Sequence, residues 1–193
     1  VDATDYECDF TPTVVDCGAA GLECDADLGC VLPSGSLLLT EFMAKGAAGA
    51  SDPHEWVEIH NPTASPINIG GVTDEGAPAM SCGLTRDGEL RYAIAGVLVV
   101  PARGFVVLAR TAQPFASHVY GTALTLPNDG ATLGLACGAQ TLDEVTYRAS
   151  NVATGISYQR DPESADDVVW CLTREGFTFA TTDGTEQQGA SRQ

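Results

Sequence analysis

The feature that most constrains the fold of this chain is its series of short apolar runs, each followed by turn-forming residues. The runs are rich in valine, isoleucine and leucine and span about five to eight residues, which is the length of a β-strand. No longer stretch combines helical periodicity with helix caps, and the nearest, 112–119, is interrupted by Pro114. We therefore expect strands near 37–43, 55–60, 66–72, 90–95, 97–100, 104–110, 123–126, 131–136, 141–147, 156–160, 168–172 and 177–180.

The run at 55–60 shows the strand pattern most clearly. Beyond Trp56 its apolar residues fall on every second position, as in a strand with one face toward solvent. Asn61 and Pro62 then end the run, because proline has no N–H to donate to a neighbouring strand. Many short strands at close spacing predict an all-β domain, either a sandwich or a barrel. Turn residues or long polar loops are expected between them, at 44–54, 73–89, 128–130 and 183–184.

The charge of the chain is strongly one-sided. It carries 26 acidic and 9 basic side chains, a formal net charge of −17, and Lys45 is its one lysine. Such a surface repels phosphate backbones and anionic lipids, so we expect neither nucleic-acid binding nor membrane insertion. An acidic surface is also common in extracellular proteins of salty habitats, so it does not by itself indicate a cation site. The start at Val1 is consistent with removal of a signal peptide.

Four of the seven cysteines, Cys8, Cys17, Cys24 and Cys30, lie within the first thirty residues. No Cys-x-x-Cys pair or nearby histidine favours zinc, so disulfides in an oxidising compartment are the better interpretation. The segment has too few large apolar residues to fold by burial alone. Its cysteines allow three pairings, and the sequence does not choose among them; we prefer the compact overlapped one, Cys8–Cys24 with Cys17–Cys30. The predicted domains are a disulfide-bonded module, a linker and a β-domain, at 1–32, 33–36 and 37–193.

The other three cysteines leave one thiol without an intrachain partner. We predict a Cys82–Cys137 disulfide, because it would link an inserted loop to the middle of the domain. Cys171, which follows Trp170, would then be a buried free thiol. An intermolecular disulfide is the alternative.

Several motifs of the chain follow one another in a fixed order. The first is Leu-Leu-Thr-Glu-Phe-Met at 38–43, followed by Glu-Trp-Val-Glu-Ile-His-Asn and by Ile-Asn-Ile-Gly-Gly. These three motifs resemble the opening of a lamin-tail domain. Val-Pro-Ala-Arg-Gly-Phe-Val-Val-Leu resembles the next hallmark of the family, and the central hairpin and a later strand follow. The resemblance covers most of 37–191, and its further motifs lie at 55–61, 67–71, 100–108, 126–133, 142–147 and 157–162.

The resemblance implies an immunoglobulin-like β-sandwich, which nuclear lamins use as an interaction module and which many secreted bacterial proteins contain. It carries no catalytic residues over to this chain. Two departures stand out: the cysteines at 82, 137 and 171 are additional, and the final segment at 185–191 lacks the proline of the usual Thr-Pro-Gly tail. The segment at 1–32 lies outside the family and resembles short cysteine-rich modules of secreted bacterial proteins.

No catalytic constellation is visible in the sequence. His54, His60 and His118 have neither the spacing of a zinc site nor a Gly-x-Ser-x-Gly turn nearby, and glycine-rich phosphate loops are absent. We therefore expect a protein that is not an enzyme and has no cofactor. A sugar-stacking platform could be formed by Trp56, Trp170, Tyr92, Tyr147 and Tyr158. A strand tryptophan more often packs in a core, which we predict for both tryptophans.

Carboxylates provide the remaining candidate sites. Glu41 and Glu58 fall on half-buried strands, where they could hold a cation or orient a crosslink to Lys45; we expect instead that backbone amides or an arginine, such as Arg103 or Arg160, donate to them. Calcium prefers oxygen ligands of the kind that two loops offer. The candidate calcium ligands are Asp52, Glu55, Asn128 and Asp129.

Together these patterns predict a secreted, non-catalytic structural or adhesive module at or beyond the cell surface. Its expected partners are other copies of the chain, as a homo-oligomer or filament, or extracellular molecules, because sandwiches have open edge strands. The alternative is a calcium-assisted module that binds carbohydrate or protein.

Overall fold

The computed structural model describes residues 22–26, 29–46, 53–72, 78–161, 169–173, 178–180 and 186–188. The chain forms two compact units, Val1–Pro33 and Ser34–Gln193, and the border between them falls at the predicted linker. In the first unit, β1 (Glu23–Asp25) pairs antiparallel with β2 (Gly29–Val31). Cys24 therefore lies directly opposite Cys30.

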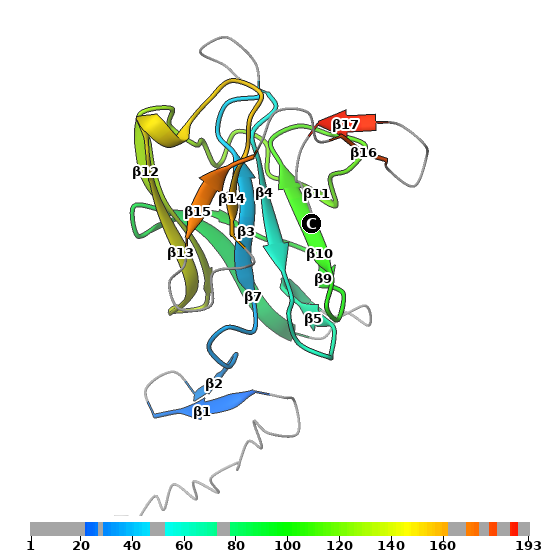
Figure 1. The fold of residues 1–193 in the computed structure, drawn as a ribbon. Helices are drawn as coiled ribbons and strands as arrows, with labels where there is room; N and C mark the ends of the chain where they lie inside the picture. The colour runs from blue at the N-terminus through cyan, green and yellow to red at the C-terminus, as the bar shows by residue number, and fades with distance from the viewer. Residues whose placement is uncertain are drawn as a thin grey trace, which may run out of the picture. The chain divides into compact units, whose positions relative to one another are not determined.

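The described part of the second unit contains two large sheets (Figure 1). The first has six strands in the order β11-β10-β4-β3-β14-β15, and its neighbours are antiparallel except for β10 and β11. The strands are β3 (Leu38–Met43), β4 (Trp56–His60), β10 (Phe105–Ala109), β11 (His118–Val119), β14 (Tyr158–Arg160) and β15 (Trp170–Leu172).

The second sheet is antiparallel and has the order β13-β12-β7-β6, with β8 also paired to β7. Its strands are β6 (Gly70–Val72), β7 (Pro78–Arg86), β8 (Glu89–Ala93), β12 (Gly130–Cys137) and β13 (Gln140–Arg148). Shorter elements are β5 (Ile67–Asn68) with β9 (Val99–Val100), β16 (Thr178–Ala180) with β17 (Glu186–Gln188), and the 3-10 turn η2 (Ala149–Asn151).

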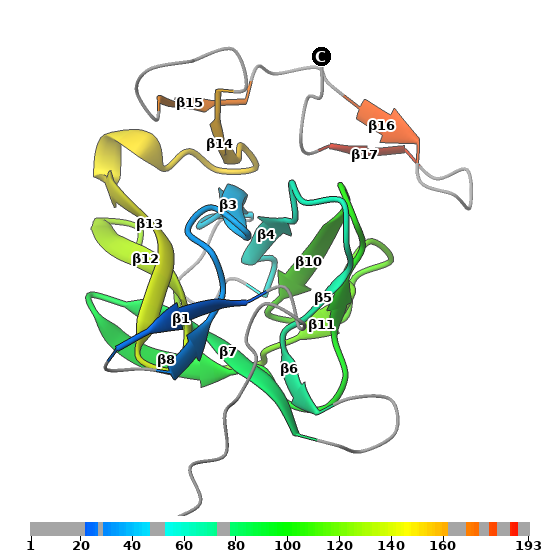
Figure 2. The ribbon, with the colours of Figure 1, turned by 90° about the horizontal axis from the view of Figure 1, so that it is seen from below.

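The hydrophobic core lies between the two sheets, which Figure 2 shows as separate layers, with β3, β4 and β10 in one and β7, β12 and β13 in the other. The ring of Phe42 on β3 packs against that of Tyr147 on β13, with centroids 4.8 Å apart. Burial of each large apolar side chain stabilises the fold by about 1.5–3 kcal/mol. The predicted all-β sandwich is thus confirmed, and its fully buried side chains include Leu39, Ile59, Leu84, Leu108, Leu133 and Tyr147.

The end of β4 is fixed by a buried asparagine. Asn61 is fully buried, and its Nδ2 donates hydrogen bonds to the carbonyl oxygens of Ser65, at 2.8 Å, and Val100, at 3.1 Å. Its Oδ1 accepts from the backbone N–H of Thr63 at 2.9 Å. The side chain thus satisfies backbone groups where the strand gives way to a turn.

The strand predictions fail at three places. The predicted loop at 73–89 contains the long strand β7, and 123–126 is not a strand. Two residues of the segment 112–119, for which no strand was predicted, form β11. The sequence of β7 includes proline, serine and glycine, which have low strand propensity, so its conformation depends on pairing with β12 on one side and β6 and β8 on the other.

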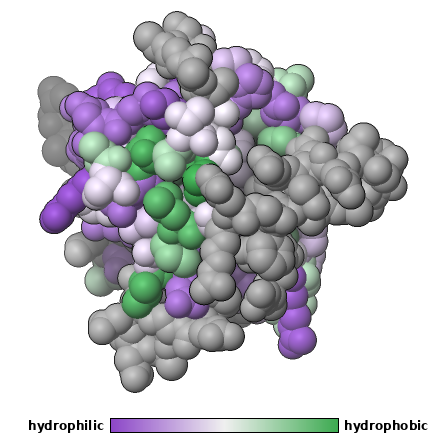
Figure 3. All heavy atoms as spheres, turned by 45° about the horizontal axis from the view of Figure 1, so that its top comes forward, coloured by the Kyte–Doolittle hydropathy of each residue, from purple (hydrophilic) through white to green (hydrophobic). Residues whose placement is uncertain are grey.

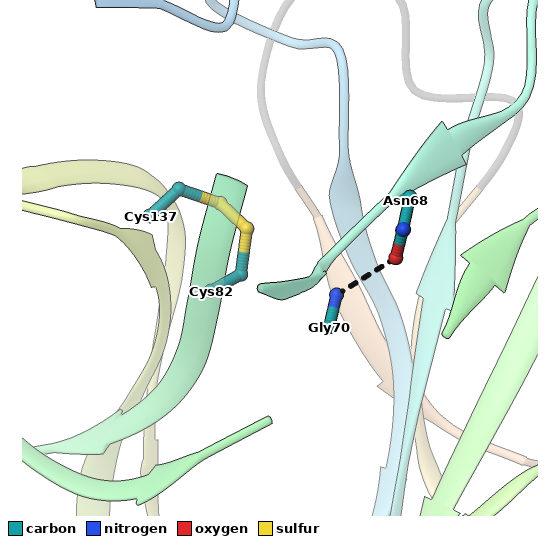
Figure 4. Close-up of a disulfide and its surroundings, with 4 residues drawn as sticks. All are labelled: Asn68, Gly70, Cys82 and Cys137. Carbon is teal, nitrogen blue, oxygen red and sulfur yellow. Dashed lines mark hydrogen bonds between the residues drawn. A yellow bond between two sulfur atoms is a disulfide. The ribbon is translucent and has the colours of Figure 1, made fainter. Parts of the chain in front are cut away.

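A disulfide joins β7 to β12 near the bend between β5 and β6 (Figure 4). Cys82 and Cys137 are directly opposite residues in the β7–β12 register, and both are buried. At the bend, the Gly70 N–H donates to Asn68 Oδ1 at 3.1 Å, and the β6–β7 register shifts just after Gly70. A side chain at Gly70 would collide with the backbone of Gly96, so glycine is required there. The predicted Cys82–Cys137 bond is confirmed.

Candidate functional site

The two carboxylates that the sequence singles out lie opposite each other. Glu41 on β3 pairs with Glu58 on β4, and both are buried, with 3% and 8% of their surface exposed. The Ser157 hydroxyl donates to Glu41 Oε1, and the Thr173 hydroxyl lies against that of Ser157. Thr40 Oγ1 donates to Glu58 Oε1 at 2.7 Å. Hydroxyl groups of the fold thus give both carboxylates structural hydrogen bonds.

Neither arginine named in the sequence prediction is a described donor to this pair. Arg160 instead forms an ion pair with Asp143, with Nη2 2.5 Å from Oδ2, and its Nε donates to the Leu39 carbonyl. Asp143 also accepts from the Leu39 N–H at 2.7 Å. Because Asp143 lies on β13 and Leu39 on β3, this group of polar contacts ties the two sheets together along one side of the sandwich.

The prediction that Glu55 is a calcium ligand is wrong. Glu55 is only 3% exposed, and its Oε1 lies 3.0 Å from Nη1 of Arg110. Its Oε2 accepts from the Leu126 N–H at 3.2 Å. Both carboxylate oxygens are therefore used inside the fold, and the Arg110 guanidinium balances the charge of the carboxylate.

The other proposed calcium ligands do not join Glu55. Asn128 and Asp129 are exposed on the turn before β12, and Asp52 lies outside the described residues. Within the described ranges, no group of three or more histidine, cysteine, aspartate or glutamate side chains is placed to hold a metal ion. A calcium site at Asn128 and Asp129 stays a prediction.

Buried Tyr147 lies near the Glu55 carboxylate. Its hydroxyl has no hydrogen-bond partner among the described residues. Burial, followed by the negative charge of Glu55, raises the pKa of this hydroxyl far above its ordinary value. Tyr147 therefore stays neutral over the whole physiological range and serves as a core residue.

The two tryptophans occupy different environments. Trp56 is buried and packs with Met43 and Ala109, which confirms its predicted core position. Trp170 is half-buried, and its ring stacks on Tyr158 with centroids 5.5 Å apart, while the Arg160 guanidinium lies 5.6 Å from the ring centre. Trp170 thus covers one margin of the core instead of lying within it.

Two cysteine predictions need correction. Cys24 has a free, exposed thiol, so the Cys8–Cys24 pairing is wrong; its cross-strand neighbour Cys30 is already disulfide-bonded. The partner of Cys30 lies outside the described residues, as do Cys8 and Cys17. Cys171 is a free thiol as predicted, but it is exposed. Side chains alternate along a strand, so when Trp170 turns toward Tyr158, Cys171 points to the opposite face.

A tyrosine and a histidine connect the two sheets at another margin, and the sequence did not predict this contact. The Tyr92 hydroxyl on β8 lies 2.5 Å from His118 Nε2 on β11, and burial raises the pKa of this tyrosine. These strands are edge strands of different sheets. The signal in the sequence was weak, because Tyr92 and His118 belong to distant runs that only the tertiary fold brings together.

The open strand edges are the remaining candidate for function. β15 ends the first sheet, and no described strand pairs with its outer side. Its three residues are uncharged, and Val169 and Leu172 are 44% and 37% exposed. Figure 3 shows that apolar side chains also gather in a strip on one face of the molecule, beside hydrophilic residues. An uncharged edge with exposed apolar side chains can accept another strand.

No protein-family model matches this chain, and no curated protein matches it. The described residues include no helix of the length and apolar character needed to cross a membrane.

Proposed function

We propose that this chain is a non-catalytic structural module of the extracellular space, built on a β-sandwich of the lamin-tail type, and that it assembles with other copies of itself. The observation that carries the proposal is the end of the first sheet at β15, an uncharged strand that contains exposed Leu172 and follows exposed Val169. In a chain with a net charge of −17, such an edge is where two molecules can meet with the least repulsion.

The polar interior supports a structural role. Glu41, Glu55 and Glu58 hydrogen-bond to groups of the fold, and Glu55 is also paired with Arg110. These contacts satisfy buried charges and hold strands and loops in place, as expected of a structural module. The Cys82–Cys137 disulfide supports an oxidising compartment, in which such bonds persist.

The test is the mass of the purified chain in solution, measured by light scattering after gel filtration without reductant. We would measure it once with millimolar calcium and once with a chelator. Species larger than the 20.0 kDa monomer in both conditions are expected. A monomer in both conditions would overturn the assembly proposal, and large species only with calcium would indicate instead that the acidic loops join the molecules.

A further inference from the structure

The open edge of β15 limits which strand can pair with it and in which register. This further step rests on the proposed function. Other strand edges of the sandwich are already engaged. β11 is linked to β8 through the contact between His118 and Tyr92. The 96–98 segment covers the β6 edge, where Leu98 accepts from the Ile69 N–H at 2.9 Å.

The remaining edge strands of the two large sheets carry charge. β8 has an exposed ion pair between Arg91 and Glu89, at 2.5 Å, and β13 carries Asp143 and Glu144. Charged side chains on an edge strand hinder its pairing with another chain. β15 differs, because Trp170–Leu172 contains no charged residue and no described strand lies beside it.

The printed hydrogen bonds fix the direction of the backbone groups on β15. The Asp161 N–H donates to the Val169 carbonyl at 2.7 Å. The Thr173 N–H donates to the Ser157 carbonyl at 2.9 Å. Both contacts join directly opposite residues when the β14–β15 register is extended by one residue at each end. Hydrogen-bonded and non-hydrogen-bonded pairs alternate in an antiparallel ladder.

This alternation shows in which direction the backbone groups of the residues between these two contacts point. Gln159 and Cys171 form a hydrogen-bonded pair, so the backbone groups of Cys171 point toward β14. The N–H and C=O groups of Trp170 and Leu172 point the other way, toward the open edge. A second strand could therefore hydrogen-bond to Trp170 and Leu172, and it would face Cys171 at a non-hydrogen-bonded position.

We propose that two copies of this chain pair antiparallel through β15, about a two-fold axis that passes beside Cys171. In this register Trp170 of each copy exchanges hydrogen bonds with Leu172 of the other. The two Cys171 residues then lie opposite each other as a non-hydrogen-bonded pair, the pair in which Cα atoms come closest. Their separation, about 4.5 Å, permits a disulfide.

The chain itself contains the same arrangement. The N–H of Cys82 donates to the Ile69 carbonyl, and its C=O accepts from Ile94, so its backbone groups point away from β12. Cys82 and Cys137 are therefore a non-hydrogen-bonded, directly opposite pair, and they form a disulfide. A second copy is favoured over an unrelated strand because a two-fold axis at the middle residue of β15 satisfies both the hydrogen-bond pattern and the exposed thiol.

The bond between the copies forms by oxidation of two thiols with a disulfide oxidant. Two Cys171 thiols and one oxidised glutathione give one Cys171–Cys171 bond and two reduced glutathione molecules. The sulfur–sulfur bond of glutathione breaks and takes up the two electrons, and the two thiol protons pass to its sulfurs.

The first experiment incubates the full chain with oxidised glutathione and separates it on a non-reducing gel. Wild type and Cys24→Ser are expected to give a covalent dimer, and Cys24→Ser combined with Cys171→Ser none. Peptide mass spectrometry should find the Cys171–Cys171 crosslink. Cys24 is the other exposed thiol of the described chain, so it is removed in both variants. A dimer that persists in the double variant, or that disappears in Cys24→Ser alone, would overturn the proposed interface.

The second experiment tests the edge without relying on the thiol. Leu172→Lys adds a charge at the interface, and Val97→Lys adds the same charge at a loop residue of similar exposure, 43% against 37%. In reducing buffer, Leu172→Lys should weaken dimerisation about tenfold, and Val97→Lys should leave it unchanged. Assembly of the wild type with equal effects of both variants would overturn this interface but leave the proposed function intact. A wild type that stays monomeric throughout would overturn both.

Discussion

The edge strands β13 and β15 differ in how readily they can pair with a strand of another chain. β13 is nine residues long, and its Asp143 binds both Arg160 and the backbone of β3. β15 has three residues, none charged, and exposed apolar side chains beside it. A long edge strand would readily pair with other chains, and charge prevents this. The comparison indicates that β13 is built to stay within its own molecule, whereas β15 is left able to meet another one.

The largest expected effect on stability comes from the disulfide between β7 and β12, the strand that pairs with β13. Replacing Cys82 and Cys137 by serine removes a crosslink that spans 55 residues, and should lower the free energy of unfolding by about 4 kcal/mol. Denaturant unfolding measures the loss. Hydrogen exchange should show faster opening in β7, β12 and β13 than in β14 and β15. Equal acceleration in both sheets would show that the two edges do not differ in this respect.

The next effect should come from the link between β13 and the first sheet. Asp143→Ala leaves Nη2 of Arg160 and the Leu39 N–H without this acceptor, and both partners of the ion pair are mostly buried. We expect a loss of about 3 kcal/mol in unfolding free energy. Exposed Glu144 on the same strand is the matched control, and Glu144→Ala should change stability by less than about 0.5 kcal/mol. Similar values for the two variants would contradict the assigned role of Asp143.

The loss of stability at alkaline pH tests the role of Tyr147, the buried tyrosine of β13. The pKa of Tyr147 is raised in the folded state, so above about pH 10 the unfolded chain loses this proton and the folded chain keeps it. Stability is therefore full below pH 10 and should fall by about 1.4 kcal/mol for each further pH unit. Tyr147→Phe should reduce this slope while leaving stability at pH 7 similar, because the lost hydroxyl has no described partner. An unchanged slope would mean that other groups dominate alkaline unfolding.

The smallest effect on stability should come from β15 itself. Leu172→Lys changes an exposed side chain, so the unfolding free energy of the monomer should stay within about 0.5 kcal/mol of wild type. Thermal unfolding at low protein concentration measures this value. A large loss would show that β15 stabilises its own sandwich, as β13 does, and would remove the contrast between the edges.

The sequence predicted the elements with strong local signals and missed those that depend on distant partners. The strand β4 and the Cys82–Cys137 bond were predicted. The predicted solvent-facing side of β4 was wrong, because Glu58 is buried together with its apolar neighbours. β7 was not, because its small and polar residues form a strand only between three other strands. Glu55 was assigned to a loop site because nothing near it in the sequence shows that Arg110 neutralises it.

What the sequence by itself determined is the fold class: short runs of period two and turn residues leave little choice other than packed β-sheets. Only the tertiary structure decided which polar groups are used internally and which edge remains open. Burial, ion pairing and strand order join residues far apart in the chain, so they depend on the complete packing of the two sheets. For the same reason the exposure of Cys171 was decided by the direction in which Trp170 turns toward Tyr158.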